Sequence, residues 1–203
     1  MNIQLIIFII ITIICHLNAM RFAWTKGKMH YKDKLSHVYD IIHSNFPDYS
    51  KYNYTKNWYL LVFIIPLILN ISNITTKFTD EYSFGYCMII LIRSLMIICT
   101  ILPRQNNCKV NKLTLFNKTI GGTCYDKMFS GHFAFGYFTT LMLFKYNFIS
   151  NTNTNKILFT FFNILHFFII GVTRSHYTID IVVSIFITMF VYFLMKENYI
   201  GFS

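Results

Sequence analysis

Six long apolar stretches alternate with polar segments along the chain. Each stretch comes close to the ~20 residues with which an α-helix crosses the hydrocarbon core of a bilayer. The repeated short segments of alternating polarity that mark barrel strands are missing. The pattern therefore predicts an all-α membrane protein, a polytopic bundle of six transmembrane helices. The predicted spans are 3–20, 58–74, 84–103, 129–149, 157–173 and 179–195.

The longest polar segment follows the first stretch and divides the chain into two parts. Residues 1–57 are predicted to form a first transmembrane helix and a basic amphipathic linker, and residues 58–203 the remaining helix bundle. Apolar linker residues from Leu35 to Ile42 recur at helical spacing, which favours a helix lying on the membrane surface. The first stretch has no basic residue before its apolar core, so we expect a retained helix rather than a cleaved signal peptide.

The composition argues against an ordinary soluble domain, because 55% of the residues are hydrophobic and only 13% are charged. The 18 Lys and Arg give a formal net charge of +10. They are scattered through the segments that connect the apolar stretches, as is typical of loops at a membrane surface. We therefore expect a membrane as the partner and no nucleic acid.

The five cysteines fall into two groups. Cys15, Cys87 and Cys99 lie in apolar stretches, where a buried thiol is the ordinary state. Cys108 and Cys124 share a polar loop, and their state depends on the compartment. They can pair if the loop faces an oxidising lumen, and they stay reduced if it faces the cytosol.

The parity of the six predicted spans gathers the chemically interesting residues on one face of the membrane. The loops after the first, third and fifth spans share a side, and they contain or adjoin Arg104, Asp126, His132, Arg174 and His176. The opposite face receives the termini and two short turns. We therefore expect a single polar site at one end of the bundle.

Two histidine motifs open the fourth and sixth spans. The first, Ser130-Gly131-His132, supplies a serine that caps a helix and a glycine that lets an anion approach the backbone. The exposed N–H groups and the positive dipole end of a helix N-terminus attract phosphate. In the second motif, His176 and Asp180 are four residues apart and share one helix face.

The pairing of His176 with Asp180 suits a nucleophilic histidine. An aspartate bonded to one imidazole nitrogen fixes the tautomer and leaves the other nitrogen able to attack. His132 can then act as the general acid that protonates the leaving alkoxide. Two alternatives stay open, namely histidines that only satisfy helix ends, and zinc binding. No further cysteine or carboxylate has ligand spacing, so we expect no metal and no cofactor.

Arginines near the predicted site are candidates for binding phosphate oxygens. Arg104 ends the third span and Arg174 lies two residues before His176. Each can steady a phosphate or simply anchor a helix end among lipid headgroups. Arg93 lies inside the third span, where an arginine needs a partner or a cavity.

Three ordered motifs resemble those of the sphingomyelin synthase-related family, a branch of the type 2 phosphatidic acid phosphatase (PAP2-like) superfamily. Their order and spacing agree with the family, and the six-span layout covers nearly the whole chain. The motifs are Arg93-x6-Thr100-Ile101-Leu102-Pro103, Cys124-x-Asp126-x3-Ser130-Gly131-His132 and His176-Tyr177-Thr178-x-Asp180-Ile181-Val182-Val183.

The resemblance implies a PAP2-like catalytic bundle over residues 58–203, with a metal-independent triad of His132, His176 and Asp180. His176 would form a phosphohistidine while His132 protonates a diacylglycerol leaving group, and the headgroup would pass from the phospholipid to ceramide. With water as the acceptor, the protein would be a lipid phosphate phosphatase. The residues expected to bind substrate or phosphate are Ser130, Gly131, Asp126, Arg104, Arg174 and Tyr177.

The chain departs from the family at two places near the site. The family's Cys-Gly-Asp is Cys124-Tyr125-Asp126 here, and the polar pair expected before the second histidine is Arg174-Ser175. Both differences bear on the choice of headgroup. A non-catalytic membrane scaffold or a transporter stands as a further functional alternative.

The family resemblance and the distribution of basic residues indicate different compartments for the site. Family members place it on the luminal or exoplasmic side of an endomembrane, the Golgi or the plasma membrane. Basic residues concentrate in the loops on the side of the site, which by the positive-inside rule indicates the cytosol. Basic residues around a site for anionic headgroups distort that count, so we expect the luminal or exoplasmic side.

Overall fold

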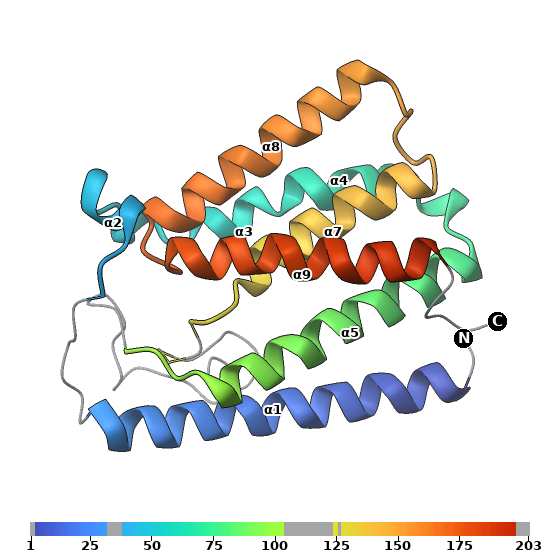
Figure 1. Ribbon diagram of the computed structural model, residues 1–203. Coiled ribbons are helices and arrows are strands. Elements are labelled where there is room, and N and C mark those ends of the chain that lie inside the picture. The colour runs from blue at the N-terminus through green and yellow to red at the C-terminus, as the bar shows by residue number, and fades with distance from the viewer. Residues whose placement is uncertain (1–2, 32–37, 104–123, 126, 198–203) are drawn as a thin grey trace.

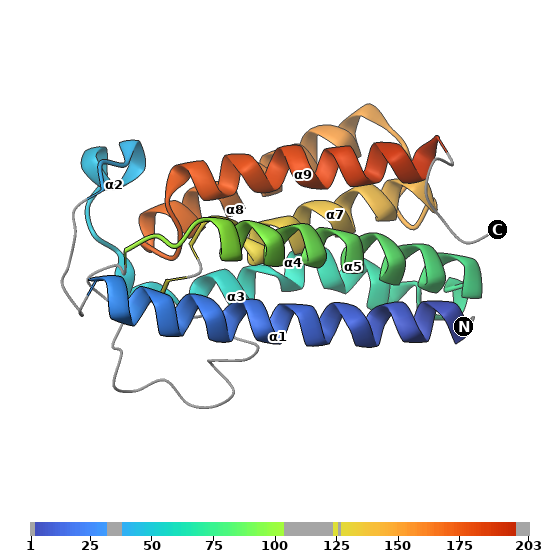
Figure 2. The same cartoon turned by 60° about the horizontal axis from the view of Figure 1, so that its bottom comes forward.

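The computed structural model of the protein describes residues 3–31, 38–103, 124–125 and 127–197. Within these ranges every regular element is a helix, and the long helices lie together in one bundle (Figure 1 and Figure 2). The all-α fold predicted from the apolar stretches is therefore confirmed.

Four of the described helices are long and apolar enough to cross a membrane. They expose large hydrophobic side chains, such as Ile10, Ile157 and Phe186, on the outside of the bundle, where the hydrocarbon of a bilayer is the natural solvent. The four helices are α1 (Ile3–Tyr31), α5 (Thr76–Cys99), α8 (Asn153–Val172) and α9 (Thr178–Lys196).

The fourth predicted span is shorter in the structure than expected. The stretch at 129–149 forms α7 (Gly131–Lys145), which has 15 residues and rises only about 22 Å against ~30 Å of hydrocarbon. Ser130 caps its start, and Asn147 follows its end with a left-handed backbone (φ 54°). These polar boundaries shorten the helix inside a longer apolar run.

The second predicted span, 58–74, is divided into short helices. These are α3 (Thr55–Tyr59), α4 (Leu61–Leu69) and the 3₁₀ turn η2 (Ile71–Asn73). Pro66 lies inside α4 and has no N–H to donate. The side chain of Asn70 donates to the Pro66 carbonyl at 2.8 Å and helps to end the helix. Six full spans are therefore not confirmed.

The first helix runs farther than predicted, because tertiary contacts hold its polar end. α1 continues from the apolar stretch to Tyr31, whose hydroxyl donates to the carbonyl of Ile101 at 2.9 Å. Gly27 packs against Tyr125 so closely that an added Cβ would lie 2.3 Å from the ring carbon Cγ. The polar end of α1 thereby belongs to the bundle rather than to a surface linker.

The amphipathic helix expected in the linker lies partly outside the described residues and stays a prediction. Leu35 lies outside the described residues, and residues 38–40 have no regular structure. Only α2 (Ile41–Asn45), which Asp40 caps, and the 3₁₀ turn η1 (Ser50–Tyr52) are formed there. The described part of the linker folds back over the ends of α8 and α9 (Figure 1).

The helix α7 forms the centre of the bundle and contacts α4, α5, α8 and α9. Its buried side chains, among them Phe138 and Met142, pack with Ile89 of α5 and Val191 of α9. On the outside, α1 lies along α5 over a contact that includes the small residues Ala19 and Ala23. Small residues let two membrane helices approach closely, so α1 is an integral part of the bundle.

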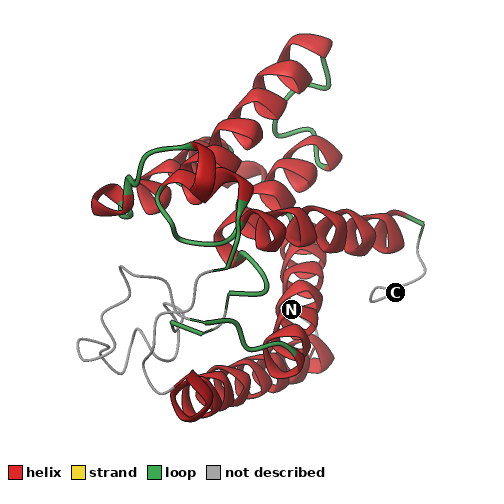
Figure 3. Ribbon diagram, turned by 60° about the vertical axis from the view of Figure 1, so that its left-hand side comes forward, coloured by secondary structure: helices red, strands yellow, loops and turns green. Residues whose placement is uncertain are grey.

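One end of the bundle collects the helix ends that carry the two histidine motifs. The C-terminal ends of α1, α5 and α8 meet the N-terminal ends of α7 and α9 there (Figure 1), and the described part of the linker lies at the same end (Figure 3). At the other end, Lys145 of α7 pairs with Glu81 of α5 at 2.5 Å.

Candidate active site

His176 and Asp180 lie side by side at the start of α9. His176 Nδ1 is 3.4 Å from Asp180 Oδ2, and the same carboxylate oxygen accepts the backbone N–H of Tyr177 at 2.9 Å. The contact between the ring and the carboxylate lacks hydrogen-bond geometry, so its attraction is electrostatic. Contacts of this kind often tighten only when a substrate binds. The arrangement leaves Nε2 as the ring nitrogen available for chemistry.

The surroundings of His176 keep its ring neutral. The side chain is buried, with 6% of its surface exposed, and burial lowers its pKa well below the ordinary value. The nearby positive charges of Lys127, Lys56 and Arg93 lower that pKa further. A neutral imidazole has the lone pair that a nucleophile needs.

The starts of α7 and α9 are joined by a small hydrogen-bond network. The backbone N–H of Ser130 donates to Ser184 Oγ at 2.8 Å. The Ser184 hydroxyl lies 2.7 Å from the carbonyl oxygen of Asp180 and 3.2 Å from that of Ser130, each of which can accept its proton. Both serines are fully buried. The network holds the two histidine motifs at the same level of the bundle.

His132 lies in the first turn of α7 and points toward the linker. Its Nε2 donates to Oδ1 of Asn57, in α3, at 2.9 Å. The backbone N–H of Ser130, two residues before His132, lies 3.4 Å from the carbonyl oxygen of Asp180. The two motifs therefore adjoin each other at the starts of α7 and α9.

Arg93 has a partner inside the membrane-spanning part of the bundle. Its guanidinium lies 2.9 Å from Nε2 of His16, and Nδ1 of the same imidazole lies 3.0 Å from the hydroxyl of Ser94. The side chain then passes over the start of α7, where a Cβ added at Gly131 would lie 3.6 Å from Arg93 Nε. The arginine that the sequence left without a partner thus reaches the site from α5.

Two lysines converge on Ser175, the residue before His176. Lys127 Nζ donates to the Ser175 carbonyl at 2.8 Å, and Lys56 Nζ donates to the Ser175 hydroxyl at 3.2 Å. The hydroxyl of Ser175 in turn donates to Oδ1 of Asn53. Together with Arg93, these ammonium groups make the site strongly positive.

The linker supports the second histidine motif from outside the bundle. Asp40 accepts hydrogen bonds from the backbone N–H of Thr178 at 2.5 Å and from its hydroxyl at 2.8 Å. His43 donates from Nε2 to the carbonyl oxygen of His176 at 3.1 Å, and its ring packs against Tyr177. His43 of the linker is therefore part of the site's wall.

The contacts of Asp40 favour the negatively charged form of its carboxyl group. Burial, the strongest influence, raises the pKa of its carboxyl. Hydrogen bonds from the backbone of His43 and from Thr178 outweigh that effect and bring the pKa below the ordinary value. Burial also lowers the pKa of the His43 imidazole, and nearby Arg174 adds to this, against the opposing effect of Asp40.

Not every residue expected to bind phosphate points into the site. Arg174 has a left-handed backbone (φ 56°), and its guanidinium donates to the carbonyl of Phe46 at 3.2 Å and lies 4.0 Å from Asp48. Tyr177 packs on His43. Arg104 and Asp126 lie outside the described residues.

The sequence also raised the state of the cysteines and the presence of a metal site. Cys124 is disulfide-bonded. Cys108, the candidate partner whose pairing the sequence left open, lies outside the described residues. The thiols of Cys15, Cys87 and Cys99 are free. In the part of the chain that the structure describes, no group of three or more His, Cys, Asp or Glu side chains has the arrangement of a metal site.

Several supporting residues were not found by sequence reasoning. Asn57 holds His132, Ser184 joins α7 to α9, and Asp40 caps the first residue of α9. Asn57 and Asp40 act across 75 and 138 residues of sequence, a separation that no local pattern reports. Ser184 did offer a signal, since it is a polar residue four positions after Asp180 in an apolar helix.

Both histidine motifs lie in the part of the chain that matches a family model. Residues 123–197 match the family model of the PAP2 superfamily C-terminal domain. This match spans α7, α8 and α9 and supports a place for the chain in the PAP2-like superfamily, as the motifs implied. No curated protein and no solved structure matches the chain. The match points to a lipid enzyme of the phosphatase or phosphotransferase type.

The Asp40 contact predicts a pH-dependent contribution to the stability of the bundle. Asp40→Asn should lower the free energy of unfolding by about 1–3 kcal/mol at neutral pH, because a charged acceptor of several hydrogen bonds is lost. A carboxyl with a lowered folded-state pKa contributes its stability above the ordinary pKa of about 4 and loses it as the pH falls through the lowered value.

Thermal unfolding of both proteins in detergent, measured from pH 7 down to pH 3, tests this. The gap in Tm between wild type and Asp40→Asn should be largest at neutral pH and close below about pH 4. A gap of constant size across this range would show that the charge of Asp40 does not stabilise the fold. Asp48→Asn, whose carboxylate is more exposed, is the matched control.

Proposed function

We propose that the protein transfers a phosphoalcohol headgroup from a membrane glycerophospholipid to ceramide, as a phosphotransferase of the sphingomyelin synthase type. The observation that supports this most strongly is the pairing of neutral, buried His176 with Asp180, beside His132 and three cationic side chains. The match to the PAP2 superfamily domain supports the same class of reaction.

In the first step, the Nε2 lone pair of His176 attacks phosphorus and forms a P–N bond. Burial lowers the pKa of His132 to about 3, and the negative charge of a bound phosphate raises it again, so that His132 is protonated in the complex. The P–O bond to diacylglycerol breaks, and His132 gives its proton to the departing oxygen. Asp180 stabilises the positive charge that develops on the His176 ring, because its carboxylate lies beside Nδ1 at 3.4 Å. Asn57 keeps the His132 ring in position.

In the second step, the hydroxyl of ceramide attacks the phosphohistidine. His132 takes the hydroxyl proton, the new P–O bond forms, and the P–N bond to His176 breaks. Water in place of ceramide gives hydrolysis through the same steps, so a lipid phosphate phosphatase is the second candidate. Its support is the PAP2 superfamily match itself, which favours neither acceptor.

We assign the phosphate oxygens to cationic side chains and backbone N–H groups of α3, α5, α7 and the loop before α7. Arg93 reaches over Gly131, and Lys56 and Lys127 lie beside His176. The first N–H groups of α7 point toward the same space, as helix N-termini do toward anions. Arg104 and Asp126 remain proposed contributors on the sequence motifs. Arg174 and Tyr177 are assigned to holding the linker, because their contacts lie there.

A headgroup-transfer assay tests the function and its two histidines. Purified protein in mixed micelles receives phosphatidylcholine labelled in its headgroup, with and without ceramide. We expect label in a ceramide-based phospholipid. His176→Ala and His132→Ala should lower the rate by at least about 1,000-fold, since each removes a group that the reaction requires.

His30→Ala, at an exposed position of α1, is the matched control and should leave the rate unchanged. Release of free phosphate from phosphatidic acid, without any ceramide product, would identify the phosphatase instead. Full function of the His176→Ala protein would leave only the scaffold or transporter alternative.

His16 acts as a positioning residue for Arg93. The loss of His16 should therefore lower kcat/KM less than the loss of Arg93 does. Arg93→Ala should lower kcat/KM by about 100- to 1,000-fold, because a cation at the transition-state charge is lost. His16→Ala leaves the arginine in place but unsupported, so we expect a loss of about 10- to 100-fold. Transfer rates at several substrate concentrations give both values.

The double variant distinguishes positioning from a general structural effect. If His16 acts only through Arg93, adding His16→Ala to Arg93→Ala should cause little further loss. Fully additive losses would contradict the coupling. Asn18→Ala, at a neighbouring exposed position of α1, is the control.

We propose that the site faces the lumen or the exoplasm, and cysteine labelling can test this. Lys51→Cys places an exposed thiol at the site end of the bundle, and Lys196→Cys places one at the other end. An impermeant maleimide added to intact cells should label only the Lys51→Cys protein at the plasma membrane. Labelling of the Lys196→Cys protein alone would place the site in the cytosol.

A further inference from the structure

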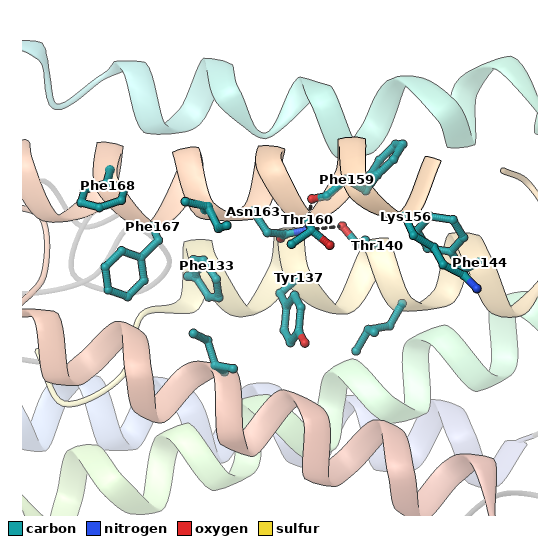
Figure 4. Close-up of a pocket in the computed structure, with 13 residues that line it drawn as sticks. Phe133, Tyr137, Thr140, Phe144, Lys156, Phe159, Thr160, Asn163, Phe167 and Phe168 are labelled. Carbon is teal, nitrogen blue, oxygen red and sulfur yellow. Dashed lines mark hydrogen bonds between the residues drawn. The ribbon is translucent and has the colours of Figure 1, made fainter. Parts of the chain in front are cut away.

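A groove of about 660 Å³ lies between α7 and α8, with Ile185 of α9 on its side. Aromatic and aliphatic side chains make up nearly all of its wall (Figure 4). It is partly open to the outside of the bundle, because its lining residues Ile164 and Phe168 are 52% and 40% exposed. In a membrane, such an opening meets lipid hydrocarbon.

The groove begins at the catalytic end of the bundle. Phe133, the residue after His132, contacts Phe167 edge-on with 6.2 Å between ring centroids, and both line the groove. Phe168 lies beside them, one helical turn before α8 ends at the loop that carries His176. At the far end, the groove reaches Lys156 near the start of α8 (Figure 4).

One polar contact holds the floor of the groove. Asn163 of α8 donates to the hydroxyl of Thr140 of α7 at 3.2 Å and to the carbonyl of Phe159 at 2.8 Å. The contact links the two helices about halfway along the groove (Figure 4). This hydrogen bond between Asn163 and Thr140 therefore bounds the groove on one side.

The length of the groove matches one lipid chain. From Lys156 to Phe168 the helix rises about 18 Å, and the half of a bilayer core that one leaflet fills is ~15 Å thick. A phospholipid whose phosphate lies between His132 and His176 has its chains at the near end of this groove. A chain that enters there can follow α8 as far as Lys156.

We infer that this groove holds a hydrocarbon chain of the lipid whose headgroup reacts at the histidine site. This inference rests on the proposed function, and it identifies the substrate as a membrane lipid with a long chain. The apolar wall stabilises the chain by contact. Because the groove leads to the histidine site, a chain bound in it aligns the phosphorus with His176.

Substitutions that fill the groove test the inference. Ile164→Trp and Leu141→Trp place a large ring among the lining residues. Each should lower kcat/KM at least tenfold for a substrate with 16-carbon chains and less than twofold for a soluble analogue with 6-carbon chains. Ile157→Trp, at a 71% exposed position of α8 that does not line the groove, is the matched control and should change neither value.

Photolabelling tests occupancy without any turnover. A phosphatidylcholine with a diazirine in one chain should label α7 and α8 peptides that line the groove in the wild-type protein. An excess of unlabelled phosphatidylcholine should compete with this labelling, and Ile164→Trp should abolish it. If the wild-type protein is inactive but is labelled in this way, the proposed function fails while the groove remains a lipid site.

Three results would overturn the inference. The first is an equal loss for long- and short-chain substrates in the filled variants. The second is labelling that no excess lipid reduces, which indicates bulk lipid around the bundle. The third is that the groove peptides carry no label because a hydrophobic peptide or a second copy of the chain protects them. This result indicates a protein partner.

Discussion

The hydrogen-bond network of Ser130, Ser184 and Asp180 is the constraint on which the site depends. Its members are backbone groups and one hydroxyl, all buried, at the point where α7 and α9 begin. An unpaired polar group there would be costly, so the two helix starts have little freedom to slide past each other. The register of α7 against α9 determines how far His132 lies from His176.

Two of the three cationic groups around this junction depend on elements that the family match does not include. Arg93 comes from α5 and is oriented by His16 of α1, and Lys56 comes from the short helix α3. The C-terminal part of the chain thus supplies the two histidines, Asp180 and Lys127, while the N-terminal part supplies Arg93 and Lys56. A bundle reduced to α7, α8 and α9 would lose these two positive charges.

Sequence patterns predicted the parts of the structure that depend on local chemistry. The apolar stretches identified the long helices. The spacing of His176 and Asp180 predicted their proximity, although His176 lies before the N-cap Tyr177 and not on α9 itself. The lengths of α4 and α7 were overestimated, because Pro66 and the polar residues around α7 interrupt long apolar runs. Contacts such as His132 with Asn57 and Thr178 with Asp40 join residues far apart in sequence. They arise only when the linker folds over the bundle.

The linker between α1 and α4 has a consequence for how such proteins diversify. It supplies Asp40, His43, Asn53, Lys56 and Asn57 to the wall of the site, yet most of it lies outside the packed core of the bundle. Substitutions in a segment of this kind alter the shape and charge of the entrance without repacking transmembrane helices. The entrance to the histidine site can therefore change in shape and charge through the linker alone, while the helices that carry His132, His176 and Asp180 keep their packing.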